Sequence, residues 1–434
     1  MKKALVLGKG KSGISAKEFL ENEGFIVEIY NTQEIKNSEE LLRDVSLICI
    51  SPGISINNEF VKYAMSKSIP VVGEIELGCK KCLSPIIAIT GTNGKTTTTS
   101  IIGDLCKTKY RTYVGGNIGL PVTSFISKVT NDDIVVLEIS SFQAESFTWF
   151  RPKISVFLNF DDDQLDRHKT KELYFQAKLN LIKNQKNTDY MVVNADDDAL
   201  CGIEKFTNAK IYKFSLKQKV YGCYMRDNCI YFNEEKVCTM PSNITSRHNR
   251  ANVLAAVCVA KLVGVSNRSI YNTISNFKIE QNRIEIVDNV NGVTFINDSK
   301  STNILSTKAA IDSIEGGLIL ILGGSDKGYD FDGLFKYFTE KIRKVYVIGE
   351  TKEKMLIAAK RTGYINIEKV GCLDIAVRKA FIFAKEGESV LLSPACASFD
   401  MFLDYKHRGR EFKRIVGEIR NENSRYENKQ EGKV

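Results

Sequence analysis

The sequence predicts an α/β protein of three domains, each built on a largely parallel sheet. Three observations lead to this fold class. Short apolar runs that end at Gly, Asn or Ser recur along the chain, they are spaced widely enough for helical crossovers, and one of them leads directly into a glycine-rich loop and a helix. The 434 residues correspond to about three domains of roughly 150 residues each. With 43% apolar residues, the chain can fill several cores.

The expected strands divide among the domains in chain order. Residues 1–82 form a Rossmann-like domain with strands expected at 3–8, 25–30, 45–51 and 70–78. Residues 83–284 form a central domain of the P-loop ATPase type with strands expected at 84–90, 133–140, 154–160 and 189–197. Residues 285–434 form a second Rossmann-like domain with strands expected in 292–300, 317–328, 344–350 and 389–398. The tail from 421 to 434 has too few apolar residues to pack and is expected to fray.

The charge is modest and spread along the chain. Lys and Arg total 61 and Asp and Glu total 52, a net charge of +9, and no run of five like charges occurs. This balance suits anionic substrates such as nucleotides, and an evenly solvated surface explains it equally well. Aromatic residues are not interleaved with basic clusters, so we expect no nucleic-acid partner.

The cysteines and the N-terminus indicate the compartment. The 11 cysteines stand mostly in apolar stretches, which is typical of buried reduced thiols, and the Cys79-x-x-Cys82 pair has no second pair at zinc spacing. We therefore expect that pair to be structural. Only four apolar residues follow the first lysines, too few for a signal peptide, and no apolar run approaches the roughly 18 residues that span a bilayer. The protein is expected to be cytoplasmic, with no membrane partner.

The strongest motif is the segment 86–102, IIAITGTNGKTTTTSII. An apolar strand leads into a loop with two glycines, then Lys95, Thr96 and a helix. Backbone N–H groups of such a loop can cradle phosphates, while the lysine neutralises them and the threonine hydroxyl can bind Mg²⁺. The common G-x-x-x-x-G-K-[ST] pattern is not met, because Ile89 stands where its first glycine would be.

The TGTNGKTTT sequence resembles the ATP-binding loop of the Mur ligase family, which includes the folylpolyglutamate synthetases. Members of this family couple ATP to the formation of an amide between a carboxylate and an amino acid. The resemblance extends in order from Gly8 to Phe412, and several motifs are similar to those of the members that add D-glutamate. It implies that ATP contacts this loop, the segment SRHNRANV and the end of the central domain: Gly91, Thr92, Asn93, Gly94, Lys95, Thr96, Thr97, His248, Asn249, Asn252 and Arg283.

The resemblance also implies a magnesium site, with two ions expected. Glu138 ends a buried strand one strand after the loop, where a carboxylate can hold a hard cation. Composition alone predicts that Lys178 is an ordinary exposed lysine. The resemblance implies instead that it is carbamylated, like the matching lysine of the family, and becomes an anionic ligand for a second Mg²⁺. Gln164 stands where relatives usually have His, and an amide oxygen is a workable Mg²⁺ ligand, so we expect altered metal affinity. His168 lies four residues further on.

The last domain resembles the part of the family that binds D-glutamate. Asp298, Lys300 and Thr302 stand in the loop INDSKSTN, and further loops after strands carry Lys327, Ser398 and Tyr405. Lysines and hydroxyls are suited to a dicarboxylic amino acid. Open α/β sheets bind ligands at the carboxyl ends of their strands, where these loops lie.

The first domain carries a G-x-G-x-x-G at Gly8, Gly10 and Gly13. A dinucleotide site would need Asp or Glu roughly 20 residues later, and the second strand ends instead in Asn31 and Thr32. The resemblance implies a site for UDP-N-acetylmuramoyl-L-alanine here, and the residues it implies are Gly13, Ile14, Thr32, Gly53, Asn117, Ser140 and Gln143.

The activity implied is an ATP-dependent ligase of peptidoglycan synthesis that adds D-glutamate through an acyl phosphate, with Lys95, Arg283, Glu138 and Lys178 as catalytic residues and a monomeric chain. Another amide ligase such as a folylpolyglutamate synthetase is an alternative, which the loop DSKSTN disfavours. A non-catalytic nucleotide-binding relative is a second alternative, which Gln164 keeps open. Because the motifs are spread over three domains, we expect domain closure during catalysis.

Overall fold

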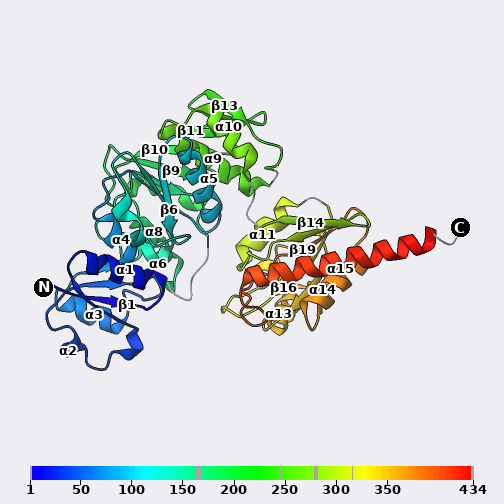
Figure 1. Cartoon of the computed structure of the whole chain (residues 1–434). Helices are drawn as coiled ribbons and strands as arrows, with labels where there is room; N and C mark the ends of the chain where they lie inside the picture. Colours follow the sequence, from blue (N-terminus) through cyan, green and yellow to red (C-terminus); the bar gives the residue numbers. More distant parts are fainter. Residues whose placement is uncertain (1, 162–167, 245, 278–281, 315, 432–434) are drawn as a thin grey trace. The chain divides into compact units, whose positions relative to one another are not determined.

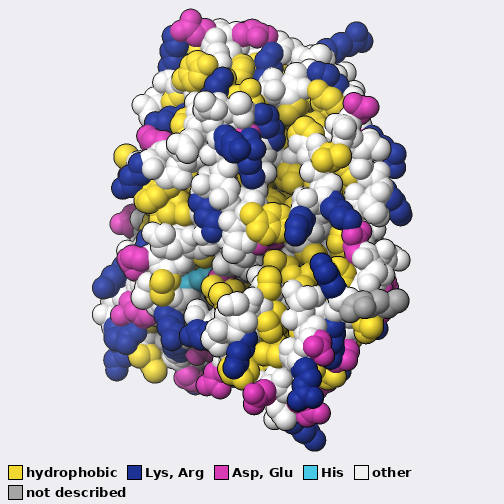
Figure 2. All heavy atoms as spheres, turned by 90° about the vertical axis from the view of Figure 1, so that its left-hand side faces the viewer, with side chains coloured by type: hydrophobic (Ala, Val, Ile, Leu, Met, Phe, Trp, Pro, Cys, Tyr) yellow, Lys and Arg dark blue, Asp and Glu magenta, His cyan; other side chains and the backbone are white. Residues whose placement is uncertain are grey.

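The computed structural model describes residues 2–161, 168–244, 246–277, 282–314 and 316–431. The chain divides into two compact units, Met1–Phe277 and Lys278–Val434 (Figure 1). On the face shown in Figure 2, Lys and Arg side chains are scattered among acidic and apolar ones, in keeping with the spread of charge along the sequence. Within the described residues, no helix combines the length and apolarity needed to cross a membrane.

The first unit begins with a four-stranded parallel sheet in the order β2-β1-β3-β4. Its elements are β1 (Lys3–Leu7), α1 (Lys11–Asn22), β2 (Ile26–Tyr30), η1 (Thr32–Glu34), α2 (Ser38–Leu41), β3 (Val45–Ile50), α3 (Glu59–Ser66), β4 (Val71–Gly73) and α4 (Glu74–Cys79). Side chains alternate along β1, so Leu5 and Leu7 join the core of α3 while Ala4 and Val6 join that of α1. The sheet is therefore covered on both faces, as its parallel strands require.

The strand expected at 70–78 is wrong beyond Gly73, where α4 begins. Every residue of α4 is buried, which explains why its sequence resembles a buried strand. Glu74 accepts hydrogen bonds from the backbone N–H (2.7 Å) and hydroxyl (2.8 Å) of Thr123, and Glu76 accepts bonds from the backbone N–H groups of 148–150. One apolar core continues from the first sheet into the second, so both belong to one compact unit.

The second sheet has nine strands in the order β13-β12-β11-β10-β9-β8-β5-β7-β6. Its elements are β5 (Ile86–Thr90), α5 (Lys95–Lys107), β6 (Thr112–Gly116), η2 (Val122–Ser124), η3 (Ile126–Lys128), β7 (Ile134–Glu138), α6 (Ser141–Ala144), β8 (Ile154–Phe157), α8 (Lys171–Leu179), β9 (Tyr190–Asn194), η4 (Asp198–Leu200), η5 (Ile203–Phe206), β10 (Lys210–Ser215), β11 (Gly222–Arg226), β12 (Cys229–Phe232), β13 (Glu235–Thr239), α9 (Arg247–Leu262) and α10 (Asn267–Asn276). Pairing is parallel from β6 to β11, and β11, β12 and β13 form an antiparallel meander. Buried β5 lies between β8 and β7, so the carboxyl end of β7 lies beside the loop that follows β5.

The second unit contains a six-stranded sheet in the order β14-β15-β19-β16-β17-β18. Its elements are β14 (Glu285–Val290), β15 (Val293–Asn297), α11 (Ile304–Ser313), β16 (Leu318–Gly323), α12 (Asp332–Phe335), β17 (Ile342–Ile348), α13 (Lys352–Thr362), β18 (Ile367–Lys369), α14 (Leu373–Phe383), β19 (Ser389–Leu392) and α15 (Tyr405–Glu431). Among the strands described, β14 pairs antiparallel with β15 and the other neighbours pair parallel. The mixed α/β class with parallel sheets is confirmed, while the boundaries at 82 and 284 and the assignment of the domains as Rossmann-like and P-loop ATPase-like stay predictions.

The expectation of a frayed tail is corrected by α15, the long red helix of Figure 1. It continues as far as Glu431. Residues 424–431 contain a single hydrophobic residue, Tyr426, but no proline or glycine, and Glu, Lys, Arg and Gln are good helix formers. A lack of packing residues therefore does not by itself end a helix.

Candidate active site

The loop after β5 has the backbone of a phosphate-binding site. Gly91 and Gly94 have φ angles of 153° and 81°, a region that favours glycine. A Cβ on Gly94 would lie 2.4 Å from Oδ1 of Asn252, so α9 closely approaches the loop. The Lys95 side chain folds back over the loop, and its Nζ donates to the carbonyls of Gly91 (2.9 Å) and Thr92 (2.8 Å). The predicted strand–loop–helix arrangement is thus present at this point.

Glu138 lies at the end of β7, where Ile89 of β5 is its register partner. It is 2% exposed, and its Oε1 accepts a hydrogen bond from Nδ2 of Asn117 at 2.8 Å. Its Oε2 has no hydrogen-bond partner among the described residues. A buried carboxylate oxygen without a partner is unfavourable in the apolar interior of a protein, and coordination of a hard cation would compensate for its burial. Glu138 therefore fits the magnesium site.

Lys178, from α8, is 1% exposed, so the composition-based expectation of an exposed lysine is wrong. Its Nζ donates to the Gly91 carbonyl (3.0 Å) and to Oγ1 of Thr90 (3.3 Å), and it lies 4.7 Å from the centroid of the Tyr174 ring. The side chain therefore reaches the same loop as Lys95. Gln164, predicted to contribute to the metal site, lies outside the described residues.

Several polar atoms of α5 and α9, the helices that meet beside the loop, are buried without hydrogen-bond partners in the described part of the chain. They are Oγ1 of Thr97, Thr98 and Thr99, Oδ1 of Asn249 and Nδ2 of Asn252. Most buried polar groups in proteins are hydrogen-bonded, and orphaned ones call for a ligand or another explanation. Thr97, Asn249 and Asn252 were predicted to contact ATP, and their position around the loop fits a nucleotide.

His168 is buried, and its Nε2 lies 3.0 Å from Oγ of Ser141. Its ring packs against Phe142 and Tyr174, with centroids 5.6 Å and 5.4 Å away. This ring nitrogen is therefore within hydrogen-bond distance of Ser141, the first residue of α6. The neighbouring Ser140 caps α6 in a reciprocal arrangement with Gln143, whose Oε1 lies 3.0 Å from Oγ of Ser140.

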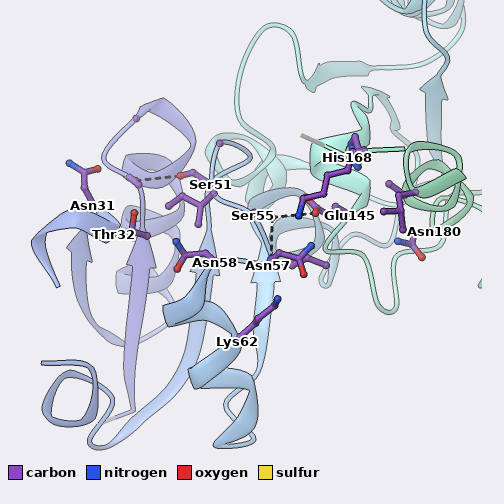
Figure 3. A pocket seen from close by; sticks show the side chains of 18 of the residues that line it. Asn31, Thr32, Ser51, Ser55, Asn57, Asn58, Lys62, Glu145, His168 and Asn180 are labelled. Carbon is purple, nitrogen blue, oxygen red and sulfur yellow. Dashed lines mark hydrogen bonds between the residues drawn. The ribbon is translucent and has the colours of Figure 1, made fainter. Parts of the chain in front are cut away.

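A pocket of about 1010 Å³ lies at the carboxyl ends of β1, β2 and β3 (Figure 3). One wall comes from the loops after these strands and from α3, and the other from the segments around α6 and α8. The lining residues are Gly8, Lys9, Gly10, Asn31, Thr32, Gln33, Ser51, Gly53, Ile54, Ser55, Ile56, Asn57, Asn58, Lys62, Glu145, His168, Lys169, Leu173, Gln176, Ala177 and Asn180. The pocket is large enough for a nucleotide sugar, and it contains the predicted Thr32 and Gly53.

Gly13 and Ile14 stand in α1, near the pocket but not in its lining. A Cβ on Gly13 would lie 1.7 Å from the carbonyl oxygen of Gly8, so this glycine allows α1 to pack against the turn after β1. Ile14 is largely exposed. The binding roles predicted for Gly13, Ile14, Asn117, Ser140 and Gln143 stay predictions.

In the second unit, Lys300, Thr302, Lys327 and Ser398 lie in loops after three neighbouring strands, β15, β19 and β16, and Tyr405 is the first residue of α15. Lys300 Nζ lies 5.9 Å from the centroid of the Tyr405 ring, so those two residues come together. Thr302 is half-buried, Ser398 is buried and Lys327 is exposed. The topology brings these loops to one edge of the sheet.

Arg408, which was not predicted from the sequence, is fully buried beneath these loops. Its guanidinium donates to the carbonyls of Ser299 (2.9 Å), Cys396 (3.1 Å) and Ala397 (3.2 Å), and burial lowers its pKa to about 10. It therefore fixes the loop after β15 to the loop after β19. The run YKHRGRE gave no signal for this role, because a basic run usually indicates a solvated helix face.

Asp298, one residue after β15, is buried. It accepts hydrogen bonds from the Ile284 backbone N–H (3.2 Å) and the Ser393 hydroxyl (2.7 Å). Burial raises its pKa to about 6, while the hydrogen bonds of Ser301 and Ser393 oppose that rise. Arg283, predicted to reach ATP, belongs to this same unit and is half-buried, and its contact with ATP stays a prediction.

Comparison with known proteins identifies two family domains in the chain. Residues 89–260 match the Mur ligase middle domain, and residues 282–396 match the Mur ligase, glutamate ligase domain. The UDP-N-acetylmuramoylalanine--D-glutamate ligase of Thermoanaerobacter sp. (strain X514) is 42% identical over 96% of this chain and 99% of its own. The protein of the same name from Caldanaerobacter subterraneus subsp. tengcongensis is 40% identical over the same shares.

Solved structures show the same fold. The UDP-N-acetylmuramate-alanine ligase MurC of Thermotoga maritima has a TM-score of 0.60 at 17% identity, covering 96% of this chain and 99% of its own. The MurF ligase of Thermotoga maritima, solved in complex with ADP, has a TM-score of 0.58 at 16% identity, covering 96% and 95%. The fold is thus similar over nearly the whole length of both chains.

Proposed function

The chain belongs to the Mur ligase family, and from this premise we propose that it joins D-glutamate to UDP-N-acetylmuramoyl-L-alanine with cleavage of ATP to ADP and phosphate. The observation that carries the ATP chemistry is the convergence of Lys95 and Lys178 on the loop after β5, beside the unpartnered oxygen of Glu138. The choice of substrates is supported by the two relatives of that name, which match 96% of this chain.

The nucleotide and metal would be held around the loop after β5. Thr96, Glu138 and Lys178, the last as a carbamate, would hold Mg²⁺, with Gln164 at the position where relatives usually have His. The bound ions, two of them on this proposal, supply charge neutralisation at the phosphates. Carbamylation would also explain why a lysine is buried here, because the carbamate is an anion that a cation can satisfy.

The reaction would proceed in two steps. A carboxylate oxygen of the alanyl group attacks the γ-phosphorus of ATP, the bond to the β-phosphate oxygen breaks, and an acyl phosphate and ADP form. The amine of D-glutamate then attacks the carbonyl carbon, inorganic phosphate leaves, and the amine loses a proton as the amide forms. Lys95 and Arg283 would stabilise the negative charge on the transferred phosphoryl group.

The other substrates would occupy the remaining sites. UDP-N-acetylmuramoyl-L-alanine would bind the pocket at β1–β3 through the residues predicted from the sequence, Thr32 and Gly53 among them. D-Glutamate would bind the loops of the second unit, where Lys300 and Lys327 would pair with its carboxylates. Thr302, Ser398 and Tyr405 would complete that site. We further propose that the chain acts as a monomer in the cytoplasm.

The test is phosphate release from ATP in the presence of UDP-N-acetylmuramoyl-L-alanine and one of several acceptors. Release is expected with D-glutamate and not with L-glutamate, L-alanine or no acceptor. Release with a different acceptor would place the chain among the other amide ligases of the family. No release with any acceptor would favour a nucleotide-binding relative without catalysis.

A further inference from the structure

The pocket of the first unit has more positive than negative side chains in its lining. Its cations are Lys9, Lys62 and Lys169, and its one carboxylate among the described lining residues is Glu145. An excess of positive charge suits a ligand that carries phosphate groups. The lysines differ, however, in whether their charge is already neutralised within the protein.

Lys9 is held by a partner. Its Nζ lies 2.6 Å from a carboxylate oxygen of Glu34, and this lysine lowers the pKa of that carboxyl. Lys62, by contrast, is an exposed side chain with no ion pair to any residue that the structure describes. On the wall formed by the first sheet, the charge of Lys62 therefore remains available to a ligand.

The local structure directs Lys62 into the pocket. Asn58 caps α3, because its Oδ1 accepts hydrogen bonds from the backbone N–H groups of Phe60 (3.0 Å) and Val61 (3.4 Å). Lys62 follows one turn later and lines the pocket, and Figure 3 shows its side chain extending from α3 toward Asn57. Asn57 and Asn58, which line the pocket just before α3, are neutral amides, and Lys9, the other cation of this wall, is paired with Glu34.

The carboxylate of the pocket, Glu145, forms no ion pair with Lys62 in the described part of the chain. Oε1 of Glu145 accepts a hydrogen bond from the Ser55 hydroxyl at 3.4 Å, and Ser55 Oγ in turn accepts one from the Asn57 backbone N–H at 3.1 Å. Glu145 is thus engaged through Ser55. Lys62 stands on the same wall as the loop of Gly53, which contributes to the proposed nucleotide-sugar site.

We propose that Lys62 binds the diphosphate of the nucleotide sugar and sets the affinity of the pocket for a nucleoside diphosphate. This inference rests on the proposed function and adds a residue that the sequence analysis did not single out. The ammonium of lysine acts on phosphate as a point charge, and a charge-assisted hydrogen bond is stronger than a neutral one. Lys62 would therefore contribute to binding and not to the chemistry of ligation.

The test is calorimetric titration of the full chain with UDP and with uridine. In Lys62→Gln we expect the affinity for UDP to fall about five- to tenfold, because one charge-assisted contact is lost. The affinity for uridine, which has no phosphate, should not change. Lys62→Arg should keep most of the affinity for UDP, and the difference between wild type and Lys62→Gln should shrink as salt is raised.

Lys67→Gln is the matched control, because Lys67 is exposed at the end of the same helix but does not line the pocket. It should bind UDP like the wild type. Unchanged affinity of Lys62→Gln for UDP, or equal losses for UDP and uridine, would overturn the inference. If the wild type ligates D-glutamate and the Lys62→Gln variant has the same KM for the nucleotide sugar as the wild type, the role of Lys62 is refuted but the proposed function is not. A wild type that neither binds UDP nor ligates would refute the proposed function as well.

Discussion

At the scale of single residues, Glu138 carries a conflict between stability and function. Its carboxylate is buried, one oxygen is bonded to Asn117, and the other has no partner among the described residues. Such a group is unfavourable in the folded chain unless a ligand satisfies it. Strained or unsatisfied groups are typical of functional sites, where they are retained for the reaction.

Glu138→Gln should therefore separate activity from stability. The change keeps the size of the side chain but removes its charge, so we expect the rate of ligation to fall about 100-fold or more. Mutation of residues that only support metal ligands already costs roughly 10–100-fold in metal affinity or activity. The midpoint of thermal unfolding without ligands should stay the same or rise. Phosphate release and a thermal scan measure the two effects. A variant that keeps full activity would contradict the placement of the metal at Glu138.

Asp298 gives a prediction about pH. Its pKa is raised by burial from 3.8 to about 6, so the folded chain binds this proton more tightly than the unfolded chain does. The contribution of the protonated group to stability is complete below about pH 4 and is lost as pH rises through about 6. The two-unit difference corresponds to about 3 kcal/mol.

Asp298→Asn cannot lose this proton, so its stability relative to the wild type should increase by up to about 3 kcal/mol between pH 4 and pH 7. Urea unfolding of both proteins across this range measures the difference. A difference that stays constant with pH would mean that the pKa of Asp298 is the same in the folded and unfolded chains.

Some residues of the site could be predicted from the sequence, and others could not. Lys95 follows a glycine-rich loop after an apolar strand, and Glu138 ends the apolar strand that comes next in the predicted order, so local sequence was enough to propose both for the site. The burial of Lys178 and Arg408 depends on packing between segments distant in the chain, which local composition does not reveal. Gln164 stays a prediction, because it lies outside the described residues.

At the scale of elements, α4 shows how a buried helix can be mistaken for a strand. Its apolar residues and two glutamates extend the pattern of β4, and only tertiary contacts decide the outcome. Glu76 accepts hydrogen bonds from the backbone N–H groups of Thr148, Trp149 and Phe150 at 2.7–2.8 Å. This single carboxylate thereby fixes the turn that precedes β8.

Removal of this carboxylate should destabilise the first unit. Glu76→Ala leaves three buried backbone N–H groups without an acceptor and creates a cavity. We therefore expect the free energy of unfolding to fall by about 3–5 kcal/mol. Glu76→Gln can still accept with its amide oxygen and should cost about 1–2 kcal/mol. Urea unfolding of both variants tests the ranking. Equal effects of the two changes would contradict the role of the oxygen as a cap.

The other strands expected in the three domains were found, because continuous apolar runs bounded by turn residues are typical of buried parallel strands. The antiparallel meander β11–β13 and the edge strand β14 were not foreseen. These strands contain charged and polar residues, such as Glu235, Lys236 and Asp288, and lack that signature. The helix of the tail was missed because packing was taken as a requirement for helix formation.

At the scale of the whole molecule, the chain consists of two compact units with three sheets. The first unit contains the loop after β5 and the pocket proposed for the nucleotide sugar, and the second contains the loops proposed for D-glutamate. The proposed reaction needs all three sites. The sequence could predict which motifs belong to which sheet, but a core shared between the first two sheets becomes visible only in the folded structure.

The central claim is tested most directly by the mass of the product formed in competition. The chain is incubated with ATP, Mg²⁺, UDP-N-acetylmuramoyl-L-alanine and equal amounts of ¹⁵N-labelled D-glutamate and unlabelled L-glutamate, and the nucleotide-sugar product is analysed by mass spectrometry. We expect a product that is heavier by one glutamyl residue, in which the nitrogen of the added residue is entirely ¹⁵N. A product in which the nitrogen of the added glutamyl residue is ¹⁴N, or an unchanged nucleotide sugar in the presence of intact ATP, would contradict this expectation.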